Sequence, residues 1–196
     1  MTARLLLLCA ITAVLSVAVG CGGGGMSKPA VGATAAPVKD YPYPVQYFPD
    51  ITPPLGSGMR HLTPGETFVY NSNPPTNGKH TSETAPAGVS GVPVPKETAV
   101  HNMEHGGVVV WVNCAGGPHS LSDADCTALR DQLGSIVERA ARGGKSVLMT
   151  VYDGMPHRIA LTAWQFLDAF DDFDKQRVQT FIDSFLCHTD IEGYCR

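Results

Sequence analysis

The sequence GVVVWV at residues 107–112 decides the fold, because a glycine is followed by five β-branched or aromatic residues without a polar break. Such a run is typical of a strand that is buried on both faces of a sheet. Two further apolar segments, Ser146–Tyr152 and Arg158–Trp164, follow it and are separated by the turn signal Asp-Gly at 153–154. We therefore expect a sheet built around residues 107–112.

Two helical patterns accompany these strands. Ser122 precedes a segment in which apolar residues recur at helical spacing, and the glycine pair at 143–144 ends it. Asp174 precedes a second amphipathic segment near the C-terminus. The order strand, helix, strand, strand, helix predicts an α+β fold with a mixed sheet. A right-handed crossover makes its first two strands parallel, and the turn makes the third antiparallel.

The N-terminal part of the folded region is expected to be long and rich in loops. Tyr41–Leu55 combines prolines with aromatic residues and predicts irregular chain. Thr67–Tyr70 predicts a short strand, and Asn71–Ser90 carries the turn signals Pro-Pro and Asn-Gly. We assign a single globular domain to residues 45–196.

Residues 1–20 have the form of an export signal, with Arg4 ahead of an apolar stretch. The small residues directly before Cys21 resemble a bacterial lipoprotein cleavage box, which implies a lipid on Cys21. The alternative is an ordinary cleaved signal with an incidental cysteine. Residues 21–44 then form a flexible tether rich in Gly, Ala and Pro. We expect the domain to be exported and held at the surface of a cell-envelope membrane.

Four of the six cysteines remain after Cys9 and Cys21 are set aside. An even number in an exported chain favours two disulfides, for which three connectivities exist. We predict local pairing, because each bond then pins a short segment; the pairs are Cys114 with Cys126 and Cys187 with Cys195. The chain has no CxxC motif, which argues against a thioredoxin-type redox site.

Composition restricts the classes of partner. Hydrophobic residues make up 43% of the 196 residues and charged residues 16%, which is enough apolar material for a core. The formal net charge of −4 argues against a nucleic-acid partner, since such domains are usually basic. The sequence does not identify a protein partner.

The densest set of potential metal ligands is the stretch HNMEHG at residues 101–106. Its imidazoles and carboxylate suit zinc or copper, and the thioether of Met103 suits copper(I). On a helix, His101 and His105 share one face with Glu104 beside them, which is the spacing of inverted zinc peptidases. The glycines that follow, however, are expected to leave room for at most one turn of helix. His80, at the end of a proline-stiffened loop, is the best additional ligand, and His61 is a weaker candidate.

Two motifs resemble a known family. PPTNGKH at 74–80 and HNMEHG at 101–106 stand in order with His61, Tyr70 and the segment ALTAW at 160–164. Together they resemble a bacterial exported or membrane-anchored family catalogued as domain of unknown function 3105, over about Gly56 to Phe185. The resemblance implies an envelope location but no activity.

This chain departs from the family pattern at three positions. Asn77, Lys79 and Met103 stand where the pattern commonly has serine, proline and leucine. The resemblance therefore implies that Met103 is at most an optional ligand.

Three functions are consistent with these residues. The first is an exported lipoprotein that captures or delivers a metal ion, with copper preferred and zinc as the other choice; its ligands come from His61, His80, His101, Met103, Glu104 and His105. The second is a metal-dependent hydrolase with Glu104 as the base. The third is a non-catalytic interaction module in which the His/Glu set is a structural hydrogen-bond network. We favour binding over catalysis, because no substrate-binding motif is visible.

Overall fold

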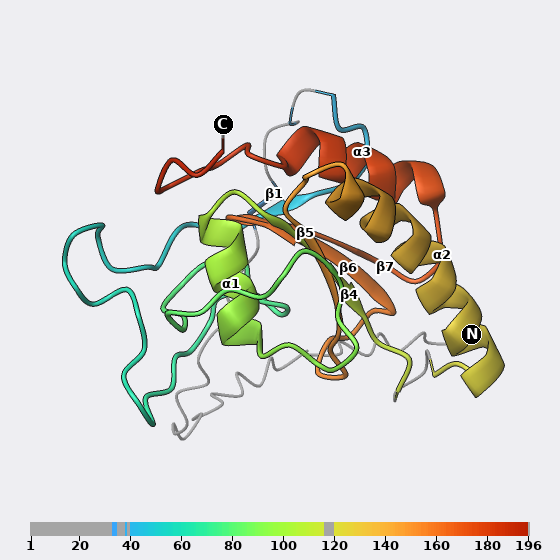
Figure 1. Ribbon diagram of the computed structural model, residues 1–196, viewed down its shortest axis with the longest axis horizontal. Helices are drawn as coiled ribbons and strands as arrows, with labels where there is room; N and C mark the ends of the chain where they lie inside the picture. Colours follow the sequence, from blue (N-terminus) through green and yellow to red (C-terminus); the bar gives the residue numbers. More distant parts are fainter. Residues whose placement is uncertain (1–32, 35–37, 39, 116–119, 196) are drawn as a thin grey trace, which may run out of the picture.

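The computed structural model describes residues 33–34, 38, 40–115 and 120–195 (Figure 1). The expected export signal, the expected lipidation site Cys21 and most of the expected tether lie outside the described residues. Among the helices of the described part, none has both the length and the apolar character needed to cross a membrane.

A mixed sheet of seven described strands forms the centre of the domain, which confirms the predicted α+β class. Its strand order is β1-β2-β7-β6-β4-β5-β3. The strands are β1 (Ala33–Thr34), β2 (Gln46–Tyr47), β3 (Gly88–Val89), β4 (Val108–Val112), β5 (Val147–Val151), β6 (Ile159–Ala163) and β7 (Phe166–Phe170).

Strand β4 lies between β5 and β6, and all five of its residues are buried. It pairs with β5 in parallel, as predicted, with Val110 opposite Met149. It pairs with β6 in antiparallel, with Val110 opposite Leu161. The third predicted strand is thus antiparallel as expected, but it lies beside the first strand and not beside the second.

Three helices cover the two faces of the sheet: α1 (Lys96–Glu104), α2 (Asp123–Arg142) and α3 (Lys175–Phe185). Helices α2 and α3 pack on the face that carries Val108, Val110 and Val112. Helix α1 packs on the other face, against Val109 and Trp111 (Figure 1). The alternation of side chains along β4 therefore divides the core into two apolar clusters.

The predicted start signals of the two long helices are confirmed. The Ser122 hydroxyl accepts a hydrogen bond from the backbone N–H of Asp125 at the start of α2. The Asp174 carboxylate accepts one from the backbone N–H of Arg177 at the start of α3, at 3.0 Å. Both side chains satisfy a backbone donor that the first turn of a helix leaves unpaired.

Helix α1 corrects the expectation of at most one helical turn before β4, because it is nine residues long. The chain passes from helix to strand within three residues. Gly106 adopts a positive φ of 79°, and its backbone N–H and that of Gly107 bond to carbonyls of the last helical turn. The two glycines thus permit a nine-residue helix that ends directly at the strand, whereas they were expected to leave room for at most one turn.

Two further expectations were wrong. Residues 67–70 are not a strand, because no segment of the described chain pairs with them, and Val69 is 89% exposed. Strand β7 was not predicted; Gln165, at a φ of 70°, turns the chain from β6 directly into it. The short strands β2 and β3 also lie within segments that we expected to be irregular.

Both predicted disulfides are confirmed. Cys114–Cys126 joins the chain after β4 to the first turn of α2, and Cys187–Cys195 closes the segment that follows α3. Disulfides persist in oxidising compartments, so they indicate an extracellular or periplasmic location.

A buried ion pair fixes α3 on the sheet. Asp168 of β7 is 2% exposed, and the Nε of Arg177 donates to its Oδ2 at 2.7 Å. The Tyr41 hydroxyl donates to the same carboxylate. Burial and the adjacent Asp168 raise the pKa of Tyr41 above its usual range, which keeps the hydroxyl protonated as a donor.

The change Arg177→Met tests this ion pair. We expect a loss of about 3 kcal/mol in the free energy of unfolding, because the Asp168 carboxylate then stays buried without its cation. Urea denaturation measures the loss. The control Lys145→Met breaks an exposed pair with Asp183 and is expected to cost less than about 1 kcal/mol. Equal losses in the two variants would contradict this assignment.

Gly106→Ala tests the link between α1 and β4. A Cβ at this position lies 2.5 Å from Sγ of Cys195 and 3.3 Å from Cα of Cys187. The control is Gly144→Ala, at a similar φ of 78° but with nothing within 4 Å. We expect the control to lose about 1 kcal/mol through backbone strain. Gly106→Ala should lose about 1–3 kcal/mol more through the clash, by thermal or chemical denaturation.

Candidate metal centre

The side chains of His61, His80, His101 and Glu104 converge on one point. One potential ligand atom from each lies within 4.8 Å of those of the others. The ring centroids are 4.9 Å apart for His80 and His101, and 5.2 Å apart for His61 and each of these two. Tetrahedral zinc sites place neighbouring ligand atoms about 3.3 Å apart, so small side-chain rotations suffice to close the set on an ion. We call these four residues the inner set.

Helix α1 supplies two members of the inner set. His101 and Glu104 are three residues apart, a spacing that places side chains on the same face of a helix. Asn102, between them, accepts a hydrogen bond from the backbone N–H of Ala85 at 2.9 Å and donates one to its carbonyl at 2.7 Å. The helix thereby also anchors the loop that leads to β3.

Two loop segments that pair through their backbones supply the other members. The N–H of His80 donates to the Arg60 carbonyl at 3.1 Å, and the N–H of Leu62 donates to the His80 carbonyl at 2.7 Å. This short parallel bridge places His61 and His80 side by side. His80 is fully buried, whereas His61 is exposed.

Backbone carbonyls orient two of the imidazoles. Nδ1 of His80 lies 2.8 Å from the Gly78 carbonyl, and Nδ1 of His101 lies 3.2 Å from that of Glu83. A carbonyl only accepts, so each Nδ1 carries a proton, and Nε2 is the nitrogen that has no backbone carbonyl as its partner. This is the arrangement that metal-binding histidines commonly have. Burial, with smaller effects of His80 and His105, lowers the pKa of His101 and so favours its neutral form.

Glu104 is a fully buried carboxylate held between two partners. Nε of Arg60 donates to its Oε1 at 2.6 Å, and Nε2 of His80 lies 2.8 Å from its Oε2. Burial by itself raises the pKa of Glu104, but the close approach of His80 and Arg60 outweighs this effect and lowers the pKa to about 2. The group is therefore an anion at the centre of the cluster.

The contact between His80 and Glu104 is short but does not have the alignment of a hydrogen bond. Nε2 of His80 and Oε2 of Glu104 are both buried, and neither has a hydrogen-bond partner among the described residues. A buried ring nitrogen and a buried carboxylate oxygen that lie close together without an aligned hydrogen bond are left unsatisfied, and a cation bound to both would satisfy them. Three imidazoles and one carboxylate are a donor set that fits zinc or copper(II).

His105 lies next to the inner set and takes a different partner. Its Nε2 is 2.9 Å from Oε2 of Glu192, and its ring stacks on that of Tyr194 at 4.0 Å. His101, Glu104, His105 and Glu192 form a second group whose ligand atoms lie within 4.8 Å of one another. We call this group the outer set, because His105 is half-buried and Glu192 is exposed.

The residues predicted as metal ligands thus lie in three parts of the structure: the inner set, the outer set and the apolar core. His61, His80, His101 and Glu104 meet in the inner set, and His105 joins through the outer one. Met103 is fully buried in the apolar cluster that contains Val109 and Trp111. Cys21 lies outside the described residues.

Sequence reasoning missed Arg60 and Glu192. Arg60 directly precedes His61, and an arginine in a loop carries no local sign that it will pair with a buried carboxylate. Glu192 lies between the disulfide partners Cys187 and Cys195. The predicted disulfide indicated that this segment forms a closed loop. It did not indicate that the loop folds against the end of α1 and so brings Glu192 to the histidines.

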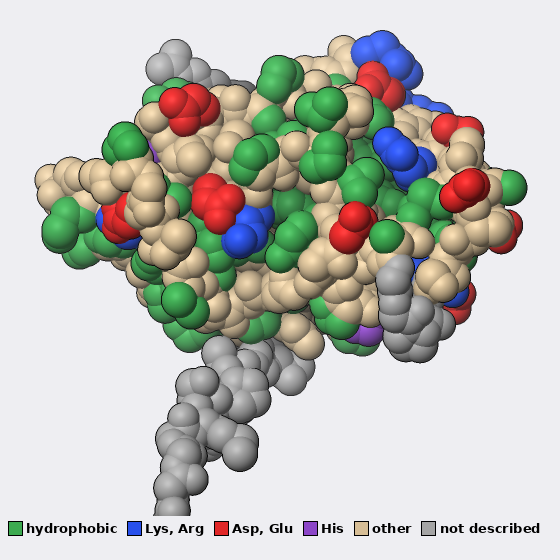
Figure 2. Space-filling model, turned by 90° about the horizontal axis from the view of Figure 1, so that it is seen from below, with side chains coloured by type: hydrophobic (Ala, Val, Ile, Leu, Met, Phe, Trp, Pro, Cys, Tyr) green, Lys and Arg blue, Asp and Glu red, His purple; other side chains and the backbone are tan. Residues whose placement is uncertain are grey.

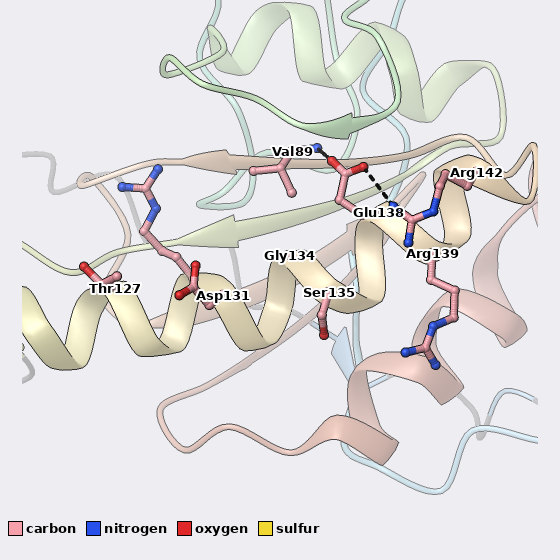
Figure 3. A pocket seen from close by; sticks show the side chains of 9 residues that line it. Val89, Thr127, Asp131, Gly134, Ser135, Glu138, Arg139 and Arg142 are labelled. Atoms are coloured by element: carbon pink, nitrogen blue, oxygen red, sulfur yellow. Dashed lines mark hydrogen bonds and ion pairs between the residues drawn. The ribbon is translucent and has the colours of Figure 1, made fainter.

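A cavity of about 560 Å³ lies elsewhere, between β3 and α2, and its lining includes no residue of either set (Figure 3). Glu138 binds the backbone N–H of Val89 and pairs with Arg142 along one side of this cavity (Figure 3). Arg139 also lines the cavity, and its side chain extends toward α3 (Figure 3). The face shown in Figure 2 carries acidic and basic side chains interspersed among apolar ones. The histidine cluster, and not this cavity, therefore brings the potential metal ligands of the described residues together.

Comparison with known proteins supplies a family and no activity. No curated protein and no solved structure matches this chain. Residues 61–193 match the family described as "Protein of unknown function (DUF3105)", a span that contains every residue of both sets. The chain belongs to the domain of unknown function 3105 family.

Proposed function

We propose that the domain binds one transition-metal ion through the inner set and captures or delivers it outside the cytoplasm. The lipid on Cys21 would hold the protein at the membrane surface. The observation that carries this proposal is the buried, unaligned approach of His80 Nε2 to Glu104 Oε2. A divalent cation between these atoms would satisfy both of them.

The orientation of the imidazoles favours a metal over a purely structural network. In a purely structural network, Nε2 of His80 is expected to donate an aligned hydrogen bond to the carboxylate. Here Nδ1 of both His80 and His101 faces a carbonyl, and Nε2 of His80 makes no aligned hydrogen bond, which leaves it for a ligand bond. The nearby Arg60 then serves to hold the carboxylate in place.

Copper is preferred to zinc on general affinity alone. Divalent copper binds nitrogen and oxygen ligands more tightly than zinc does. The thioether of Met103 packs in the apolar core, so a soft sulfur ligand no longer supports copper(I). Copper(II) is accordingly the ion that we propose, with zinc as the alternative.

The geometry favours binding over hydrolysis. A general base needs an oxygen that can reach a metal-bound water and receive its proton. Glu104 is fully buried; its Oε1 is held by Arg60, and its Oε2 faces His80. We infer that Glu104 is a ligand and that the exposed His61 is the point at which the ion contacts solvent.

Metal counting tests the proposed function. The purified protein is mixed with Cu²⁺ or Zn²⁺, freed of excess, and analysed for bound metal. We expect one equivalent in the wild type. The double variant His80→Gln/His101→Gln should bind more than about 100-fold more weakly, because it loses two ligands.

The matched control is His188→Ala, which removes an exposed histidine that packs on the rings of Phe166 and Phe185. It should retain the ion. Equal and tight binding by the wild type and the double variant would refute this site.

Thermal melting separates a metal centre from a structural network. A ligand that binds only the folded state raises its stability by about 2.7 kcal/mol at 100 times its Kd. We expect Cu²⁺ to raise the Tm of the wild type and a chelator to reverse the shift. The double variant should show no shift. A variant that loses Tm equally with and without metal, beside a wild type that never responds, would support the structural network instead.

A further inference from the structure

We propose that the ion has two overlapping positions, the outer set and the inner set, and that it passes from the first to the second through the shared residues His101 and Glu104. This inference rests on the proposed function. The outer set, with two carboxylates and two imidazoles, would capture the hydrated divalent cation. The inner set, with three imidazoles and one carboxylate, would retain it.

The positions of the rings support a continuous path. His101 lies between His105 and His80, with ring centroids 4.5 Å and 4.9 Å away. An ion that keeps His101 and Glu104 as ligands can exchange His105 and Glu192 for His80 and His61 one at a time. No step requires the ion to lose all its protein ligands, and its charge does not change.

The two positions exclude each other, because each shared residue offers one ligand atom. Arg60 occupies Oε1 of Glu104, which leaves Oε2 for a metal. The Glu83 carbonyl occupies Nδ1 of His101, which leaves Nε2. Two ions cannot both be bound by the same two atoms with full coordination. We therefore expect a single ion that exchanges between the sets.

The outer set is held in place by the C-terminal segment. The Cys187–Cys195 disulfide closes this segment, and the Asp190 carboxylate accepts hydrogen bonds from the backbone N–H groups of residues 193, 194 and 195. The N–H of Ile191 bonds to the Glu104 carbonyl at 3.3 Å, and that of Cys187 to the Gly106 carbonyl at 2.9 Å. These contacts fasten the loop to the end of α1 before Glu192, and after Glu192 the ring of Tyr194 stacks on that of His105.

Exposure gives the direction of transfer. The outer set has one exposed and one half-buried member, whereas three of the four residues of the inner set are buried. Each set thus has one exposed member, but that of the outer set is the carboxylate of Glu192, which attracts a cation from solvent, whereas that of the inner set is the imidazole of His61. Its final position lies where Oε2 of the buried Glu104 and Nε2 of the buried His80 lack hydrogen-bond partners among the described residues.

The test compares the rate of Cu²⁺ uptake with the final bound state. The variant His105→Phe/Glu192→Gln keeps a ring against Tyr194 and the size of residue 192, but removes the outer ligands. We expect it to bind one equivalent with the same electron paramagnetic resonance spectrum as the wild type. Its uptake in stopped-flow mixing should be at least tenfold slower.

A reciprocal variant and a charge control complete the design. His61→Phe/His80→Gln should take up Cu²⁺ as fast as the wild type but hold it more weakly, with a spectrum of fewer nitrogen ligands. Asp183→Asn removes one exposed negative charge on α3 and should leave both rate and spectrum unchanged. The single variant Glu192→Gln, at an exposed position, should slow uptake in the same direction as the double variant.

The outcomes distinguish failure of metal binding from failure of the transfer between the two sets. A wild type that binds neither Cu²⁺ nor Zn²⁺ contradicts the proposed function itself. Two tightly bound equivalents per wild-type chain contradict mutual exclusion. One equivalent in the wild type, with unchanged uptake in His105→Phe/Glu192→Gln, overturns the two-position path and leaves the inner site intact.

Discussion

The buried carboxylate of Glu104 is the constraint on which the rest of this face of the protein depends. An ionised group without solvent is costly unless cations and donors surround it. Arg60 and His80 meet that need, and both come from chain with little regular structure. The loops that precede α1 are therefore held on the sheet by polar contacts to one helix end as well as by apolar packing.

The sheet separates two kinds of packing. On the side of α2 and α3 the core is apolar and continuous, with the ion pair of Asp168 and Arg177 at its margin. On the side of α1 a smaller apolar cluster carries the histidines and Glu104 at its edge. The first side gives a rigid support, and the second uses that support to hold polar groups in fixed positions. This division suits a binding site that must keep its ligands oriented before the ligand arrives.

The sequence pattern was sufficient to predict those elements that depend on neighbouring residues alone. The buried run of β4, the capped starts of α2 and α3 and the short disulfide loops could all be read from neighbouring residues. Helix α1 could not, because its hydrophobic contrast is weak and the glycines after it carry opposite meanings as helix ends and helix breakers. The grouping of His61 and His80 with α1 was proposed from residue type. The partners Arg60 and Glu192 depend on how distant loops fold, which no local spacing encodes.

The Cys187–Cys195 disulfide has a consequence for when the surface over His105 is completed. Its two sulfurs can hold the C-terminal segment closed only after two electrons and two protons have been removed. In a reducing compartment the same chain has two thiols, and Glu192 and Tyr194 lose the covalent closure that presents them to the end of α1. The redox state of the surroundings thus determines whether this half of the ligand set has covalent support or only the hydrogen bonds of Asp190, Ile191 and Cys187.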